Sequence, residues 1–223
     1  MKPQSICLLG YRGTGKTTIG AILAQQLNWH LMEMDFLITM ESGKTHDQLT
    51  KNGTDWQEFR ALEQTIFKEV LETDSIVIST GGGVCVNSVI HTVSGQTFGQ
   101  ENTAELHAAL QRNVLPILIT TESSTLLERI KQQELEKAAT KRPILNEQRA
   151  REVQALLDQY KEDPEEQKRI LVEAIVEDNK KMYEARQPLY AALTKHVVDT
   201  TNIDINDAVE QVSEIIKLET NTN

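Results

Sequence analysis

Short apolar runs alternate along the chain with longer segments in which apolar residues recur every three or four positions. The short runs are typical of buried strands, and the longer segments are typical of helices with one apolar face. This alternation predicts α/β units around a parallel sheet. The predicted strands are Ser5–Leu9, Leu31–Asp35, Ser75–Thr80, Leu115–Thr120 and His196–Asp199. The predicted helices are Lys16–Leu27, Trp56–Glu72, Ala104–Arg112, Glu122–Glu134 and Ile205–Lys217.

A charge-rich stretch, residues 146–187, interrupts this alternation. Its apolar residues keep helical spacing on both sides of Asp163-Pro164, and the residue before a proline is pushed out of helical geometry. We therefore predict two helices with a break at Pro164. The segment Ser94–Asn102 is rich in Gly, Ser, Asn and Gln, which predicts a surface loop. The polar tail Thr220–Asn223 is expected to fray.

Composition and charge narrow the classes of function. The net charge of −10 argues against broad contact with nucleic acid or an anionic membrane, because both favour basic surfaces. No apolar stretch reaches the length of about 18 residues that a membrane span needs. Two cysteines are too few for a disulfide framework, and no signal peptide precedes the first strand, so we expect a cytoplasmic protein. An anionic ligand would need local cations, for which the candidates are Lys16, Arg12, Arg60, Arg129, Arg142 and Arg186.

The strongest motif is a phosphate-binding loop, Gly10-Tyr11-Arg12-Gly13-Thr14-Gly15-Lys16-Thr17, which matches G-x-x-x-x-G-K-[ST]. It follows a predicted strand and opens a predicted helix, as the motif requires. Glycines let the backbone N–H groups turn towards phosphate oxygens, and the helix N-terminus adds partial positive charge. Lys16 can bridge the β- and γ-phosphates of ATP, and the Thr17 hydroxyl can ligate Mg²⁺. The predicted nucleotide contacts are Gly13, Thr14, Gly15, Lys16, Thr17 and Thr18.

The rest of the chain distinguishes among the proteins that share this loop. There is no guanine-reading N-K-x-D sequence, and no apolar strand ends in Asp-Glu as in many ATPases. Instead, the chain resembles the shikimate kinase family over nearly its whole length. The resemblance rests on motifs in the family's order, namely the phosphate loop, Met32-Glu33-Met34-Asp35, Phe59-Arg60-Ala61-Leu62-Glu63, Ser79-Thr80-Gly81-Gly82-Gly83, Lys141-Arg142-Pro143-Ile144-Leu145 and Arg186-Gln187-Pro188-Leu189-Tyr190.

This resemblance implies an acceptor site for shikimate, which carries one carboxylate. Asp35 would accept the proton of the attacking hydroxyl, and the alternative for an aspartate here is a helix N-cap. Arg60 and Arg186 would bind the carboxylate together, with Glu63 orienting Arg60. The alternative for Arg60 is an exposed helix ion pair, and the alternative for Arg186 is a solvated helix end before Pro188. Gly81, Gly82 and Gly83 would let the backbone approach the substrate ring closely.

The resemblance also implies which residues bind ATP, the phosphate donor. Arg142 would reach over the phosphates from a lid and stabilise charge on the transferring group, alongside Lys16 and Asp35 as catalytic residues. Arg129 falls near the family's adenine-packing position, although a solvated helix charge fits it nearly as well. The backbone of Thr200–Asn202 would complete the adenine pocket. Thr17 and Glu33 would serve Mg²⁺, the latter through water.

Three features depart from the family pattern. Glu33 stands where the family usually has aspartate, and the extra methylene matters because Mg²⁺ demands tight octahedral geometry. Arg12 adds a cation near the substrate side, either for phosphate or for an acceptor with more negative charge. The lid region is about two dozen residues longer than in relatives, judged from the spacing of its flanking motifs. It is either a longer lid or a surface for subunit or partner contact.

The sequence thus predicts a single domain, residues 1–223, with a three-layer P-loop kinase fold. A five-stranded parallel sheet would carry helices on both faces, a substrate region at about 35–63 and an extended helical lid at about 136–187. The predicted reaction is phosphorylation of the shikimate 3-hydroxyl by ATP and Mg²⁺, by a monomer or by a dimer formed through the lid. The alternatives are a kinase for another hydroxy acid such as gluconate, or a kinase-like regulatory protein that retains nucleotide binding.

Overall fold

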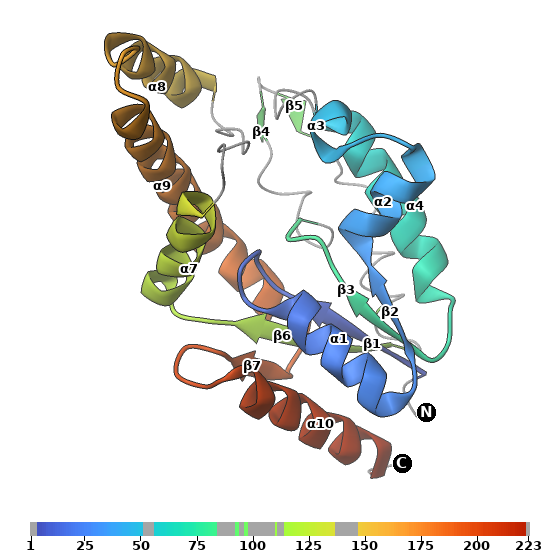
Figure 1. Ribbon diagram of the computed structural model, residues 1–223. Helices are drawn as coiled ribbons and strands as arrows, with labels where there is room; N and C mark the ends of the chain where they lie inside the picture. Colours follow the sequence, from blue (N-terminus) through green and yellow to red (C-terminus); the bar gives the residue numbers. More distant parts are fainter. Residues whose placement is uncertain are drawn as a thin grey trace.

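The computed structural model describes residues 4–50, 56–83, 92–93, 96–97, 110, 114–136 and 147–221. Its centre is a parallel sheet of five strands in the order β2-β3-β1-β6-β7 (Figure 1). The strands are β1 (Ser5–Leu9), β2 (His30–Glu33), β3 (Ile76–Ser79), β6 (Val114–Thr120) and β7 (Val197–Asp199). All residues of β1 and β3 are buried, as expected for strands covered on both faces. The predicted five-stranded α/β fold is confirmed.

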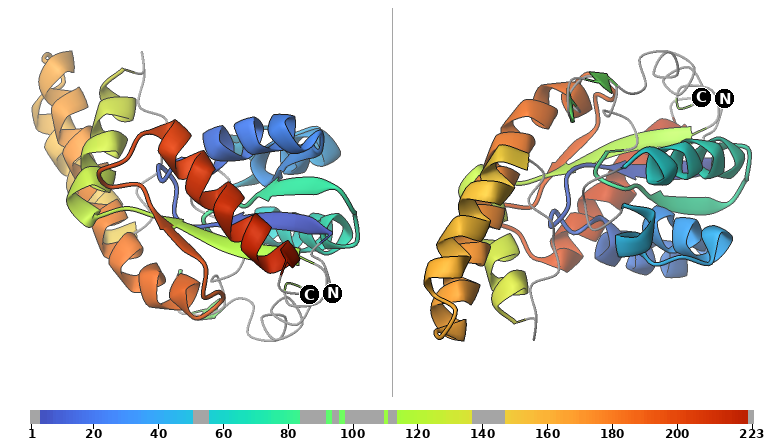
Figure 2. Two further views of the ribbon diagram at one scale, coloured as in Figure 1. Left: turned by 90° about the horizontal axis from the view of Figure 1, so that it is seen from below. Right: turned by 90° about the horizontal axis from the view of Figure 1, so that it is seen from above.

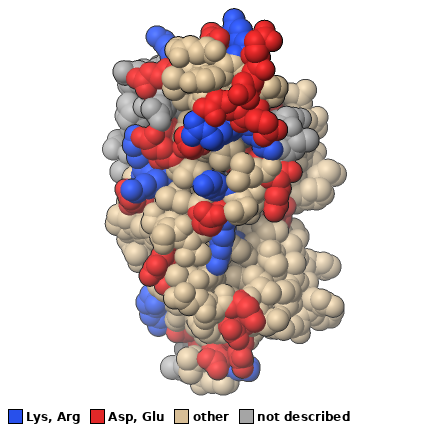
Figure 3. All heavy atoms as spheres, turned by 60° about the vertical axis from the view of Figure 1, so that its left-hand side comes forward, with Lys and Arg blue, Asp and Glu red and all other residues tan. Residues whose placement is uncertain are grey.

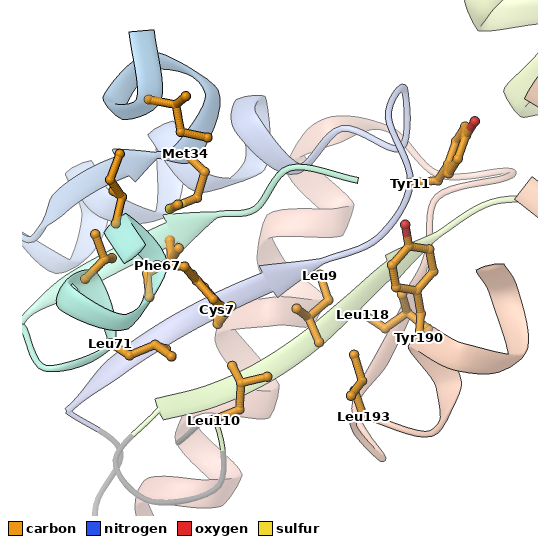
Figure 4. Packing of buried hydrophobic residues seen from close by; sticks show 14 of the residues in the cluster. Cys7, Leu9, Tyr11, Met34, Phe67, Leu71, Leu110, Leu118, Tyr190 and Leu193 are labelled. Carbon is orange, nitrogen blue, oxygen red and sulfur yellow. The ribbon is translucent and has the colours of Figure 1, made fainter. Parts of the chain in front are cut away.

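Helices cover both faces of the sheet (Figure 2). Their buried side chains form two apolar clusters, one on each face. On one face, α1 (Lys16–Leu27) and α10 (Ile205–Asn221) pack together against the strands. The other face holds the larger cluster, to which α2 (Met34–Ser42), α3 (His46–Leu49), α4 (Gln57–Leu71), α7 (Ser123–Leu135) and α9 (Pro164–Ala191) contribute. Figure 4 shows this cluster from Leu71 near one end of the sheet to Tyr11 and Tyr190 near the other. The end with the tyrosines lies beside the phosphate loop.

The charge-rich stretch forms the predicted pair of helices, α8 (Glu147–Gln159) and α9. Pro164 is the first residue of α9, where a missing N–H costs nothing, and the Asp163 side chain caps the helix by accepting a hydrogen bond from the Glu166 N–H at 3.0 Å. The helix then continues through Pro188 to Ala191. Figure 3 shows acidic and basic side chains interspersed on the face that these helices present, and ion pairs such as Lys181 with Glu177 at 3.0 Å account for part of that pattern.

Some predicted boundaries were wrong. The second strand ends at Glu33 rather than Asp35, because the chain turns into α2 as soon as its partner strand β3 ends at Ser79. Within the predicted loop Ser94–Asn102, β5 (Gln96–Thr97) pairs antiparallel with β4 (Thr92–Val93). The last helix continues past the predicted Lys217 to Asn221, so the first two residues of the tail expected to fray are helical, and the other two lie outside the described residues. Of the predicted helix Ala104–Arg112, only Leu110 lies within the described residues, where it is helical and buried.

Candidate active site

The phosphate loop joins β1 to α1 at the carboxyl edge of the sheet, the edge where open α/β sheets bind ligands. Gly13 and Gly15 adopt φ values of 81° and 99°, a left-handed conformation that side chains disfavour. At Gly10, a Cβ atom would lie 2.2 Å from the carbonyl oxygen of Ile119, so a larger residue would collide with β6. The loop therefore needs its glycines for its path as well as for its approach to phosphate.

Lys16 is buried in the first turn of α1, and its Nζ donates to the carbonyl oxygen of Tyr11 at 2.8 Å. Burial lowers the pKa of Lys16 to about 8, and the carboxylates of Asp35 and Glu33 oppose this shift. The ammonium group is thus held in a poorly solvated place with negative charge on one side. Phosphate oxygens arriving at the loop would stabilise its charged form.

Two side-chain hydroxyls meet where the loop faces β3, and a glutamate ends the neighbouring strand β2. The Thr17 hydroxyl lies 3.1 Å from the hydroxyl of Ser79, and Glu33 is the register partner of Ser79 across the two strands. Burial raises the pKa of Glu33, with Asp35 adding to the shift and Lys16 opposing it. Hydroxyl and carboxylate oxygens are the donors that Mg²⁺ prefers, so this set fits the ion. Within the described ranges, no group of three His, Cys, Asp or Glu side chains could hold a metal ion.

A buried ion pair fixes Arg60 on α4. Its Nη1 lies 2.5 Å from Oε2 of Glu63, whose side chain is fully buried, and its guanidinium lies 4.9 Å from the ring centre of Trp56 and 5.0 Å from that of Phe59. Burial raises the pKa of Glu63, and the charge and hydrogen bond of Arg60 lower it. The predicted pairing of Arg60 with Glu63 is present, and it leaves the guanidinium in a nearly fixed position.

The glycine turn after β3 brings the predicted acceptor residues together. A Cβ atom at Gly81 would lie 2.6 Å from Oε1 of Glu63 and 3.2 Å from Oδ1 of Asp35. A Cβ atom at Gly82 would lie 3.8 Å from Nη1 of Arg186. Asp35, the Arg60–Glu63 pair and Arg186 therefore surround one turn, although they come from three different helices. Gly83 is buried and is the last residue of that turn within the described range.

Arg186 lies on α9 with 5% of its surface exposed. Its Nη1 donates to the carbonyl oxygen of Gly82 at 2.7 Å, and the Tyr190 hydroxyl donates to the same oxygen. The alternative of a solvated charge at a helix end is therefore wrong, because the side chain is buried and the helix continues past it.

Asp35 lies in the first turn of α2, where a negative charge is favoured by the helix dipole. The N-cap position of α2 belongs to Glu33, which makes no side-chain cap hydrogen bond. The N-cap alternative for Asp35 is thus wrong, and its carboxylate remains beside Gly81 and Lys16.

On the nucleotide side, Arg129 of α7 donates to Thr200 through both its Nη atoms, to the hydroxyl at 3.1 Å and to the carbonyl oxygen at 2.7 Å. This joins Arg129 to the start of the predicted adenine segment, and the Thr200 hydroxyl in turn donates to the carbonyl of Thr14 at 3.3 Å. Thr18 is exposed in the first turn of α1. Arg142 lies outside the described residues.

Sequence reasoning assigned no role to two residues that contact the phosphate loop. The Ser79 hydroxyl, at the start of the glycine motif, lies beside that of Thr17, and Asn179, which belongs to no motif, accepts a hydrogen bond from the Tyr11 hydroxyl. Tyr11 fills a variable position of the phosphate-loop motif, so the motif gave no signal for it. In the part of the chain that the structure describes, no helix is long and apolar enough to cross a bilayer.

A sequence model of the family described as shikimate kinase matches residues 12–217. The chain belongs to the shikimate kinase family. Shikimate kinase 2 of Photorhabdus laumondii is 27% identical over 196 residues, which cover 88% of this chain and 86% of the relative. The shikimate kinase of Clostridium botulinum strain Eklund 17B is 42% identical over 81 residues, and the chain spans 48% of that relative's length. Among solved structures, the shikimate kinase of Acinetobacter baumannii in complex with shikimate aligns with a TM-score of 0.62 at 19% identity, covering 97% of this chain and 94% of that one.

Two residues that the motif comparison marks as departures border the site. Glu33 contributes to the electrostatic environment of Lys16. Arg12 has its backbone nitrogen 3.4 Å from where a Cβ of Gly82 would stand, so its position in the loop borders the glycine turn.

Proposed function

We propose that this protein transfers the γ-phosphoryl group of ATP to the 3-hydroxyl of shikimate. The observation that carries the proposal is the convergence of Asp35, Arg186 and the Arg60–Glu63 pair around Gly81 and Gly82, beside Lys16. Two fixed guanidinium groups suit an acceptor with one carboxylate, and a carboxylate near the phosphate loop suits a hydroxyl that must lose a proton.

In the proposed reaction, the shikimate hydroxyl oxygen forms a bond to the γ-phosphorus as the bond from that phosphorus to the β,γ-bridging oxygen breaks. Asp35 takes the hydroxyl proton late in transfer, and ADP leaves with the bridging oxygen. Lys16 neutralises charge on the phosphates, and Arg60 and Arg186 orient the acceptor through its carboxylate. Mg²⁺, held at Thr17 and near Ser79 and Glu33, would supply charge neutralisation on the phosphate oxygens.

The long hairpin of α8 and α9 serves, in this proposal, as part of an enlarged lid that covers the same reaction. Arg142 would act from this lid on the transferring group, and Arg129 with Thr200 would border the adenine. The family relationship also supports a cytoplasmic enzyme. We propose a monomer, and light scattering that gives the mass of two chains would support the dimer through the lid instead.

The test is product detection with ATP, Mg²⁺ and shikimate. Wild type should form shikimate 3-phosphate, and Asp35→Asn should reduce kcat by about 10²- to 10⁴-fold, the usual contribution of a positioned acid or base. Asp74→Asn is a matched control, because Asp74 is exposed at the opposite, amino end of β3. Normal turnover by the Asp35→Asn protein would remove Asp35 from the assigned role.

Two results would favour the alternatives. Thermal stabilisation and turnover with gluconate, but not with shikimate, would identify a kinase for another hydroxy acid. Binding of both ATP and shikimate without phosphorylated product, in either Mg²⁺ or Mn²⁺, would identify a kinase-like regulatory protein.

A further inference from the structure

Tyr11, the second residue of the phosphate loop, contacts two separate parts of the site. Its carbonyl oxygen accepts hydrogen bonds from the Lys16 ammonium and from the Thr14 hydroxyl, both at 2.8 Å. Its side chain is 3% exposed, and in Figure 4 it stands beyond the carboxyl end of β1. The backbone of Tyr11 therefore belongs to the nucleotide side, while its side chain points elsewhere.

The side chain of Tyr11 packs against one face of α9. Asn179, Tyr183 and Arg186 follow one another at intervals of four and three residues, so they share a helix face. The Tyr11 hydroxyl donates to Oδ1 of Asn179 at 2.9 Å, and its ring meets the Tyr183 ring edge-on with centroids 5.4 Å apart. The guanidinium of Arg186 lies 5.7 Å from the centre of the Tyr11 ring.

The hydrogen bond to Asn179 has a defined direction. The Asn179 amide nitrogen donates to the Ile175 carbonyl at 2.6 Å, one helical turn earlier, so its oxygen is the atom that faces Tyr11. Asn179 is 6% exposed, and hydrogen bonds in such surroundings are costly to lose because the groups left behind cannot reach water. The contact ties the phosphate loop to α9 across 168 positions of sequence.

Arg186 is held between this tyrosine and the glycine turn. The Tyr11 ring lies beside its guanidinium, and the Gly82 carbonyl accepts from its Nη1 at 2.7 Å. A ring at this distance attracts the cation and limits its rotation. Moving the Tyr11 side chain would therefore alter where the guanidinium points.

We propose that Tyr11 is a positioning residue that fixes Arg186, and with it the acceptor, relative to the phosphate loop. This inference rests on the proposed function, because it concerns how the acceptor's carboxylate is presented to the γ-phosphate. The backbone of Tyr11 contacts Lys16 of the nucleotide site, and its side chain contacts Arg186 of the acceptor site. A substitution changes only the side chain. It should therefore weaken the binding of shikimate and leave the binding of ATP unchanged.

The experiment compares Tyr11→Phe and Tyr11→Leu with wild type. Tyr11→Phe removes only the hydrogen bond to Asn179 and should raise the KM for shikimate about fivefold. Tyr11→Leu also removes the ring beside Arg186 and should raise this KM by about thirtyfold. The Kd for ATP, measured by calorimetry without shikimate, should stay within about twofold of wild type in both, because the carbonyl that holds Lys16 remains.

Leu218→Ala is the control, since Leu218 is 67% exposed and lies on α10, which covers the sheet face opposite α9. It should match wild type in every measurement. Melting temperatures show whether each variant is folded, and a purely structural role would lower them without separating the shikimate KM from the ATP Kd. The graded order, wild type, then phenylalanine, then leucine, is expected only if the ring and the hydroxyl each contribute to placing Arg186.

The outcomes separate this inference from the proposed function. An unchanged shikimate KM in both variants, or equal losses for ATP and shikimate, overturns the positioning role while phosphorylation of shikimate by wild type stands. If wild type phosphorylates another hydroxy acid instead, the same comparison is made with that acid and decides in the same way. If wild type phosphorylates none, the proposed function and the positioning role both fail.

Discussion

The buried carboxylate of Glu63 forms an ion pair with Arg60, which lies about one turn earlier on α4. The distance from Nη1 of Arg60 to Oε2 of Glu63 is 2.5 Å. The pair sits against the glycine turn, since a Cβ at Gly81 would come within 2.6 Å of the other carboxylate oxygen. Glu63 therefore need not contact the substrate. Its role is to hold the Arg60 guanidinium, which we expect to bind the substrate carboxylate.

Replacing Glu63 with Gln should raise the KM for shikimate about tenfold, because Arg60 loses its charged partner while the volume is kept. Steady-state kinetics with shikimate as the varied substrate measures this effect. Glu58→Gln on the same helix is the control, since its pair with Lys44 is about half exposed and should contribute little.

The raised pKa of Glu63 gives the same site a pH dependence. A carboxyl with a raised pKa takes up its proton at a higher pH than an ordinary glutamate, and the neutral form holds Arg60 less firmly. The shikimate KM of wild type should therefore rise as the pH falls through the acidic range. Glu63→Gln should show a high KM with less of this dependence. An identical pH profile in the two proteins would contradict the assignment.

Lys16 should couple ATP binding to proton uptake. Its pKa of about 8 in the structure means that part of the population is neutral just above that pH, and the phosphates of ATP require the charged form. ATP affinity should fall as the pH rises through 8, and binding near pH 8.5 should take up protons from the buffer. Calorimetry in two buffers of different ionisation enthalpy measures this uptake. Lys16→Met should bind ATP weakly without it.

Gly81 and Gly82, the first two glycines of the turn after β3, should differ in their tolerance of an added methyl group. Gly81→Ala places a Cβ 2.6 Å from Glu63 and 3.2 Å from Asp35, so the catalytic carboxylate or the ion pair must shift. At Gly82 the nearest atom would be 3.4 Å away. We expect Gly81→Ala to reduce kcat/KM for shikimate by about tenfold or more and Gly82→Ala by much less. Equal losses at both positions would contradict the geometry.

Shortening Glu33 tests the metal site. Glu33→Asp keeps the charge and withdraws the carboxylate by one methylene, which should relax the geometry near Thr17 and Ser79. Half-maximal activity should then require less Mg²⁺, by about threefold, because the ion tolerates little distortion of its octahedron. Titration of activity with Mg²⁺ at saturating ATP measures the change. A higher Mg²⁺ requirement in the variant would mean that the longer side chain is matched to this site.

Hydrophobic periodicity and the position of proline in the sequence were enough to predict most of the fold. β1, α1 and the break at Pro164 lie where periodicity and proline chemistry place them, because each is decided by neighbours in sequence. The end of β2 was missed because it depends on where its partner strand stops, which is a tertiary fact. The passage of α9 through Pro188 was also unpredicted. There the loss of one backbone hydrogen bond near the helix end is offset by the anchoring of Arg186 and Tyr190 to Gly82.

The candidate site was predictable to the extent that motifs mark it. Asp35, Arg60 and Arg186 were found by resemblance, and the structure brings them to one turn. The contact between Tyr11 and Asn179 could not be found in this way, because it joins a variable loop position to an insertion-bearing helix 168 residues away. No local rule selects such a pair. Only the packing of α9 against the loop creates it.

The length of α9 has a mechanical consequence. The helix has 28 residues, and the residues from Asn179 to Tyr190 fasten its second half to the loop and the glycine turn. A straight helix of this size is about 42 Å long, so its two halves contact different parts of the molecule. The first half packs against α7, where Lys168 donates to the Leu135 carbonyl at 2.7 Å. One continuous helix therefore joins the residues around Gly82 to α7, so a shift of either end would be felt at the other.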